Sequence, residues 1–64
     1  MEYLTPQKIK IIKLVAEGYE NSEIAKLLNI SISTVKTYLR TIFEDLSLRN
    51  RAQLAAWAVK NGLL

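Results

Sequence analysis

Residues 32–46 carry two long cationic side chains, Lys36 and Arg40, four positions apart. At about 100° per residue of an α-helix they lie on one face, which they share with the short polar residues Ser33 and Thr37. Lys and Arg only donate hydrogen bonds, and guanine O6 and N7 in a major groove only accept them. Thr hydrogen-bonds a base edge or sets its methyl group against thymine. This face therefore has the chemistry of a helix that reads base edges in double-stranded DNA.

An apolar stripe with 4-3-4 spacing runs along the opposite side of the same segment: Val35, Leu39, Ile42 and Leu46. The stripe predicts a helix that packs on a core and turns its polar face outward. Any helix of a small bundle also presents a polar face to water, which explains Lys36 and Arg40 as solvated side chains. Periodicity alone does not separate a DNA-reading helix from a helix of a generic protein-binding bundle.

Two adjacent carboxylates, Glu44 and Asp45, end this segment and point to different sides of a helix. Glu44 stays on the polar face. There it either accepts a hydrogen bond from a cytosine amino group or repels phosphate and lowers non-specific binding. Asp45 is rotated toward the flank of the helix, where we expect it to pair with Arg49 or Arg51.

Short turn segments divide the chain into four helical segments, and no strand pattern with a period of two persists. Gly18 is a left-handed stop after the first segment, and Asn29 suits the left-handed residue of a tight turn before the third. The residues suited to begin the helices are, in order, Thr5 with Pro6, Asn21 or Ser22, Ser31, and Asn50. We therefore expect an all-α fold, a compact four-helix domain containing a helix-turn-helix, with helices at about residues 6–17, 21–28, 32–46 and 50–60.

The composition argues against several kinds of site. The 64 residues include no Cys and no His, so a disulfide, a thiolate metal site and the commonest general base are ruled out. We expect no metal, no cofactor and no enzymatic activity, since no paired inward carboxylates take their place. The net charge of +3 favours a polyanionic partner. No apolar run approaches the roughly 20 residues of a membrane span and no signal peptide is visible, so we expect a cytoplasmic location.

Several stretches of the chain follow one known pattern: LTP at 4–6, LVAEG at 14–18, NSEIAKLLNIS at 21–31, TVK at 34–36 and NRA at 50–52. Together they resemble the LuxR-type (NarL/FixJ/GerE-like) helix-turn-helix domain over essentially the whole chain, as one domain of residues 1–64. The resemblance implies a bacterial transcription regulator, commonly the output domain of a response regulator or quorum-sensing receptor. It implies double-stranded DNA and a second copy of the chain as partners, RNA polymerase as a further candidate, and no small-molecule ligand within this domain.

The resemblance also assigns roles to individual residues. The third helix would read bases in the major groove with Lys36, Thr37 and Arg40. Contacts to phosphate would come from the starts of the second and third helices: Asn21, Ser22, Ser31, Ser33 and Thr34. The fourth helix would mediate dimerisation through Gln53, Trp57 and Lys60. Core packing explains Trp57 equally well, because a Trp ring serves either as an interface anchor or as a core residue.

The chain departs from the LuxR-type pattern in three places. The first helix of the family usually opens with Arg-Glu-x-Glu, but Gln7, Lys8 and Lys10 stand here, which weakens the capping box. Tyr38 replaces a frequent His. Asp45 stands where a basic residue is common, which argues against a phosphate contact from that end of the third helix.

Two other functions stay open. A protein-interaction module that binds a regulator and has lost strong DNA affinity would explain Glu44 and Asp45. A helix-turn-helix like region 4 of sigma factors would also bind promoter DNA, but as part of polymerase. The fourth helix argues against the second of these, because it gives the domain an association surface of its own.

Overall fold

Four α-helices make up most of the computed structural model, which describes residues 4–64. They are α1 (Pro6–Ala16), α2 (Asn21–Leu28), α3 (Ile32–Leu46) and α4 (Arg51–Lys60). Residues 4–64 contain no strand, and none of their helices is long and apolar enough to cross a membrane. The prediction of an all-α domain with four helices is confirmed. The bounds differ from the predicted ones only at the end of α1 and the start of α4, by one residue each.

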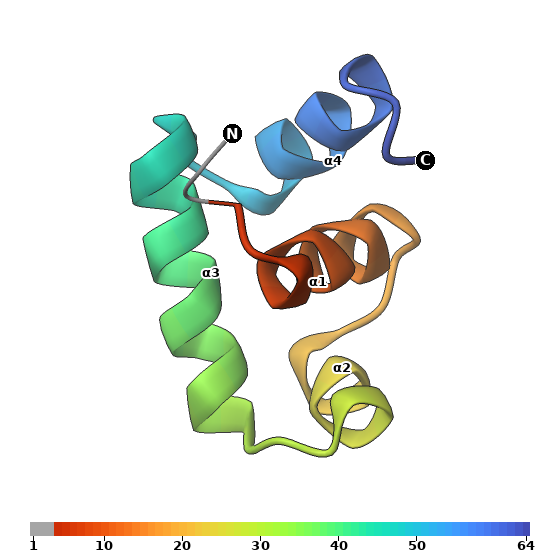
Figure 1. The fold of residues 1–64 in the computed structure, drawn as a ribbon, viewed down its shortest axis with the longest axis vertical. Helices are drawn as coiled ribbons and strands as arrows, with labels where there is room; N and C mark the ends of the chain where they lie inside the picture. The colour runs from red at the N-terminus through yellow and green to blue at the C-terminus, as the bar shows by residue number, and fades with distance from the viewer. Residues whose placement is uncertain (1–3) are drawn as a thin grey trace.

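The long helix α3 runs along one side of the molecule, and α4, α1 and α2 follow one another beside it (Figure 1). α1 lies between α4 and α2 and packs against α4 and α3. The short connection after α2 sets that helix against α3 near the N-terminal end of α3. One side of α3 is therefore covered by other helices, and the other side is left open.

Local hydrogen bonds cap the helices at most of the expected residues. At the start of α1, Thr5 Oγ1 accepts a hydrogen bond from Lys8 N at 3.3 Å. At the start of α3, Ser31 Oγ accepts one from Thr34 N at 3.0 Å. Each side-chain oxygen satisfies a backbone N–H that has no partner inside the helix, so these caps define where the helices begin.

Left-handed residues follow the first three helices. Gly18 has a φ of +96° after α1, and Asn29 has a φ of +56° after α2, as the sequence predicts. Ser47 ends α3 in the same conformation, with a φ of +56°. The sequence does not indicate this, because a serine rarely adopts a left-handed backbone. A hydrogen bond of 2.9 Å from Leu48 N to the carbonyl oxygen of Phe43 closes the turn.

The residue that caps α2 differs from the prediction. Asn21 is the first helical residue and Glu20 is the N-cap, so neither Asn21 nor Ser22 caps this helix. Glu20 forms a capping box with Glu23, whose Oε1 accepts a hydrogen bond from Glu20 N at 2.8 Å. The Asn21 side-chain oxygen is occupied by Arg51, which lies 30 residues away in the sequence. A long-range contact has thus taken the oxygen that local rules would assign to the cap.

The core consists of apolar side chains from all four helices: Ile11, Ile12, Val15, Ile24, Ala25, Val35, Leu39, Ile42, Leu54 and Ala58. No polar side chain within residues 4–64 is buried. The predicted apolar stripe of α3 is confirmed for Val35, Leu39 and Ile42, while Leu46 is half-buried. Because the stripe holds one side of α3 against the core, the polar residues of α3 face away from the core.

Candidate nucleic-acid interface

The outward face of α3 is polar and open to solvent. Lys36, Thr37 and Arg40, which the sequence assigns to base reading, are all exposed. Val35 and Leu39, their neighbours in the chain, are buried in the core. The structure therefore places the three side chains together on the free side of α3, in its N-terminal and middle turns.

Hydroxyl groups along this face bond to the helix itself. Thr37 Oγ1 donates to the carbonyl oxygen of Ser33 at 3.1 Å, and Thr41 Oγ1 donates to that of Thr37 at 3.1 Å. At the start of the helix, Ser31 Oγ and Thr34 Oγ1 lie 2.8 Å apart, so one of them donates to the other. A hydroxyl carries a single hydrogen. One hydrogen of this second pair is therefore left for an outside acceptor such as phosphate, whereas Thr37 has none.

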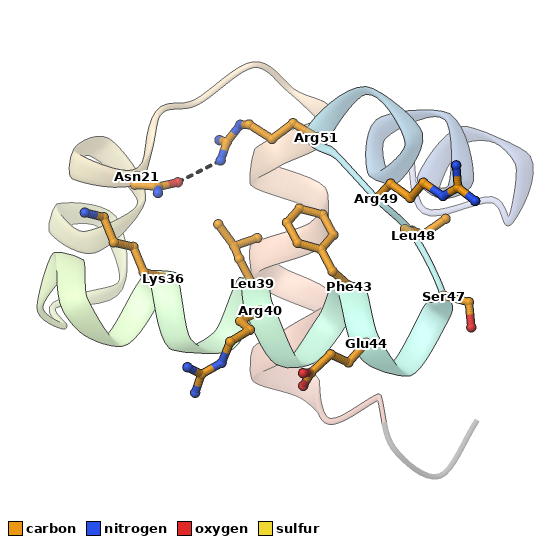
Figure 2. Close-up of a pocket in the computed structure, with 10 residues that line it drawn as sticks. All are labelled: Asn21, Lys36, Leu39, Arg40, Phe43, Glu44, Ser47, Leu48, Arg49 and Arg51. Atoms are coloured by element: carbon orange, nitrogen blue, oxygen red, sulfur yellow. Dashed lines mark hydrogen bonds between the residues drawn. The ribbon is translucent and has the colours of Figure 1, made fainter.

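A groove of about 660 Å³ lies between α3, the start of α2 and the segment that leads into α4 (Figure 2). Leu39 and Phe43 point into it from α3, and Leu48 lines it from the connecting segment. The charged side chains around it are Lys36, Arg40, Arg49, Arg51 and one acid, Glu44. The groove thus combines an apolar floor with a mainly positive rim, beside the exposed face of α3.

The charged side chains of α3 leave the helix in different directions. Lys36 extends toward the start of α2, whereas Arg40 and Glu44 point together away from α2, at the edge of the groove that they help to line (Figure 2). Both Arg40 and Glu44 are exposed. A carboxylate therefore stands one turn beyond the second cation on the same open face.

Arg51 joins the start of α4 to the start of α2. Its Nη1 donates to Asn21 Oδ1 and its Nη2 to the carbonyl oxygen of Tyr19, both at 2.7 Å. Both acceptors are neutral, so neither of them offsets the positive charge that the guanidinium brings to the groove. The sequence pattern points to Arg49 and Arg51 only as partners of Asp45. The sequence did hold a signal for a wider role of Arg51. This cation stands in the first turn of α4, where it opposes the helix dipole, so a further contact is expected to stabilise it there.

Asp45 pairs with Lys8, and not with Arg49 or Arg51 as the sequence led us to expect. Lys8 Nζ lies 3.0 Å from Asp45 Oδ2, and the two side chains are 15% and 26% exposed. The chain enters α1 beside the C-terminal half of α3, which brings Lys8 to that flank, whereas both arginines line the groove. Lys8 and Asp45 are both departures from the LuxR-type pattern. The structure joins these two residues in one ion pair.

Asn21 and Ser22, expected to contact phosphate, differ in their surroundings. Asn21 is half-buried, and because its oxygen is bound by Arg51, its amide NH₂ is the group left to donate. Ser22 is exposed, but it lies next to the capping box of Glu20 and Glu23. Two carboxylates flank both residues at this end of α2 and oppose an approaching phosphate.

The three dimerisation candidates lie at spacings of four and three residues on α4, which puts them on one side of that helix. Gln53 and Lys60 are exposed. Gln53 also takes part in the cap of α4, as its N donates to Asn50 Oδ1 at 2.9 Å and its Oε1 accepts from Arg49 N at 2.7 Å. The expected cap at Asn50 is thereby confirmed.

Trp57 is the third of these candidates and is half-buried. It lines a hollow with Leu4, Ile9 and Leu63, and its carbonyl oxygen accepts a hydrogen bond from Asn61 Nδ2 at 2.8 Å. The ring therefore packs on α1 and on the C-terminal segment with part of its surface still exposed. Packing and association are compatible at this position.

The arrangement of α2, the left-handed Asn29 and α3 defines a helix-turn-helix domain. α2 packs against α3 and supports it, and α3 turns a basic face to solvent beside a positive groove. This is the arrangement with which such domains bring their second helix into a DNA groove. Within residues 4–64, no cluster of three or more His, Cys, Asp or Glu side chains could hold a metal ion.

Comparison with known families identifies the class more closely. The family model described as "Bacterial regulatory proteins, luxR family" matches residues 2–58. The chain belongs to this family, and the resemblance seen in the sequence is confirmed. The family is one of DNA-binding regulatory domains and not of enzymes.

Similar proteins carry regulatory names. The chain is 40% identical over 62 residues to "Probable transcriptional regulator ycf29" of Porphyra purpurea, which covers 97% of this chain. It is 38% identical over 63 residues to "Response regulator protein VraR" of Staphylococcus aureus and of Staphylococcus epidermidis, which covers 98% of this chain. In each case the chain spans only 30% of the length of the relative.

Proposed function

We propose that this chain binds double-stranded DNA in a sequence-specific manner and regulates transcription, with α3 in the major groove. The observation that carries the proposal is the exposed face of α3, on which Lys36 and Arg40 stand one turn apart while the other side of the helix is buried. A major groove admits one helix, and side chains that only donate are matched by guanine acceptors. Membership of the luxR family supports the same function.

Lys36, Thr37 and Arg40 are the proposed base-reading residues. The proposed phosphate contacts surround them at the starts of α2 and α3: Asn21, Ser22, Ser31, Ser33 and Thr34. The groove adds Arg49 and Arg51 to this set, because their charges lie beside the same face of α3. Phosphate contacts orient the domain on the duplex, and the base contacts supply its sequence preference.

We further propose that two copies of the chain bind a two-fold related site, with Gln53, Trp57 and Lys60 of α4 at the contact between them. The exposed side chains of Gln53 and Lys60 and the exposed part of Trp57 support this assignment. Half-sites for a helix-turn-helix dimer lie about one helical turn of DNA apart, or a multiple of it. The half-site spacing of the selected DNA tests this geometry.

The relatives are about three times as long as this chain, and one of them is named a response regulator. We propose that the chain acts as the DNA-binding output domain of such a regulator in the bacterial cytoplasm. RNA polymerase is the candidate partner for its effect on transcription. Pull-down of polymerase from a mixture containing the promoter duplex tests that contact.

The central test is a binding titration with duplex DNA selected from a random-sequence pool, at two salt concentrations. Lys36→Ala and Arg40→Ala should each weaken specific binding by about 1–3 kcal/mol, as expected for loss of one good base contact. Lys13→Ala removes the same charge from an exposed position that lines a different hollow, on α1, and serves as the matched control. The logarithm of affinity should fall with the logarithm of salt by roughly 0.9 per phosphate contacted.

The proposal fails if no sequence is enriched from the pool. It also fails if Lys36→Ala and Arg40→Ala weaken binding no more than Lys13→Ala does. An equal loss of affinity in all three variants would show that the net positive charge of the chain alone attracts it to DNA.

A second candidate function is that of an interaction module for another protein. The apolar floor of the groove, formed by Leu39, Phe43 and Leu48, favours it, because DNA recognition does not require such a floor. Titration at low salt distinguishes the two functions. A module of this kind would show no salt-dependent binding to duplex DNA, while Phe43→Ala would abolish its capture by the partner.

A further inference from the structure

Thr37 is the least explained of the three base-reading side chains. Its neighbours on the open face, Lys36 and Arg40, end in charged groups that can only donate hydrogen bonds. Thr37 ends in a hydroxyl, which usually both donates and accepts. Its hydrogen is already used, since Thr37 Oγ1 donates to the carbonyl oxygen of Ser33 at 3.1 Å. Thr37 therefore has no donor to offer to a base.

The same bond determines which branch of the side chain stands free. The Cβ atom of Thr37 carries a hydroxyl and a methyl group, and the hydroxyl oxygen is held against the preceding turn of the helix. The methyl is the branch that makes no bond to the helix, at a residue that is exposed to solvent. Thr41 makes the same bond one turn later, to the carbonyl oxygen of Thr37 at 3.1 Å, so this conformation is repeated along α3.

The edges of the bases respond differently to such a side chain. Guanine presents only acceptors in the major groove, and without a donor Thr37 cannot bind them. Thymine presents a C5-methyl group, which an apolar group contacts favourably. Accepting a hydrogen bond from adenine N6 or cytosine N4 would need the hydroxyl oxygen that is turned to the helix.

We propose that Thr37 selects a T·A base pair through contact between its methyl group and the thymine C5-methyl, an inference that rests on the proposed DNA binding. Lys36 and Arg40, which only donate, select guanine acceptors on the neighbouring pairs. The half-site is thus divided between hydrogen-bonded guanine positions and one thymine position that is read without a hydrogen bond.

The test begins with selection of bound duplexes from a random-sequence pool by the 64-residue chain. Thymine should be enriched at one position of each half-site, next to positions enriched in guanine. Replacing that thymine by deoxyuridine removes only the C5-methyl and should weaken binding about fourfold per half-site. The same replacement outside the enriched sequence is the control for the duplex and should have no effect.

Two substitutions separate the methyl group from the hydroxyl. Thr37→Val keeps a methyl and removes the hydroxyl, so it should retain both the thymine preference and the fourfold loss with deoxyuridine. Thr37→Ser keeps the hydroxyl and removes the methyl, so it should bind the thymine and deoxyuridine duplexes equally. Thr41→Val loses the same kind of bond to the helix, and its melting curve controls for any change in helix stability.

The outcomes distinguish this inference from the function on which it rests. A pool without any enriched sequence would refute the DNA-binding proposal itself. An enriched sequence would leave that proposal intact. In that case the inference is overturned if guanine occupies the position affected by Thr37 substitutions, or if Thr37→Ser still distinguishes thymine from deoxyuridine.

Discussion

The ion pair between Lys8 and Asp45 allows a quantitative prediction, because both charges stand at the unfavourable ends of their helices. Lys8 lies in the first turn of α1, which has no acidic residue, and Asp45 in the last turn of α3, which has no basic one. Each charge opposes its helix dipole, at a cost of about 0.3–1 kcal/mol. The attraction across 3.0 Å offsets this cost. We expect about 1 kcal/mol for it, the upper end for exposed pairs, since the side chains are only 15% and 26% exposed.

Exchanging the two charges in the double variant Lys8→Glu/Asp45→Lys keeps the pair and reverses both dipole terms. It also restores a carboxylate three residues after Thr5, the arrangement of a capping box. We therefore expect the double variant to be more stable than the parent by about 1 kcal/mol, the lower end of the range when two dipole terms of about 0.3–1 kcal/mol each change sign. This corresponds to a rise in Tm of about 4–8 °C for a domain of this size. Each single variant places like charges together and should be less stable than the parent.

The assay is thermal and urea unfolding followed by circular dichroism, for the parent, both single variants and the double variant. The double-mutant cycle isolates the coupling between positions 8 and 45 from every other contact that either side chain makes. Raising the salt to 1 M should reduce the coupling, because the screening length then falls to about 3 Å. Additive effects of the two single substitutions, or a double variant clearly less stable than the parent, would refute the reasoning.

Three further predictions test other contacts. Arg51→Lys should lower stability by about 1 kcal/mol, since an ammonium cannot reproduce the forked contact with Asn21 and Tyr19; equal unfolding midpoints in urea would contradict it. Ser47→Gly should raise stability by roughly 1 kcal/mol in the same assay, because it relieves a left-handed backbone at a φ of +56°, and a loss would show that the serine side chain contributes more than the strain. Glu44→Gln should tighten binding to a random-sequence duplex in a fluorescence titration if this exposed carboxylate repels phosphate; unchanged non-specific binding together with lost specificity would instead indicate contact with a cytosine amino group.

Short-range signals explain why so much of the fold follows from the sequence. The caps at Thr5, Ser31 and Asn50 each join atoms three residues apart, so residue type alone indicates them. Residue type alone also indicates the left-handed Asn29. The buried stripe of α3 follows from the spacing of apolar residues within that one helix. The residue that caps α2 was predicted wrongly although its signal is also local. Asn and Ser are stronger cap residues than Glu in isolation, and the capping box of Glu20 reverses that preference.

The exposure of Lys36, Thr37 and Arg40 could likewise be inferred from their place opposite the buried stripe. Their role in reading DNA remains a prediction, supported by membership of the luxR family. The positive groove could not be inferred in this way. Its walls come from the start of α2, from α3 and from the segment before α4. The residue pattern within a single helix does not indicate how these three parts pack against one another.

The sequence by itself determined the four helices, the class of fold and the face that α3 turns outward, because these depend on residues within one or two turns of each other. Only the tertiary structure decided the partners of the charged side chains. Asp45 pairs with Lys8 across 37 residues, and Arg51 binds Asn21 across 30. The packing of apolar side chains sets how the helices cross, and that crossing brings one cation within reach of Asp45 and holds the others beside the groove.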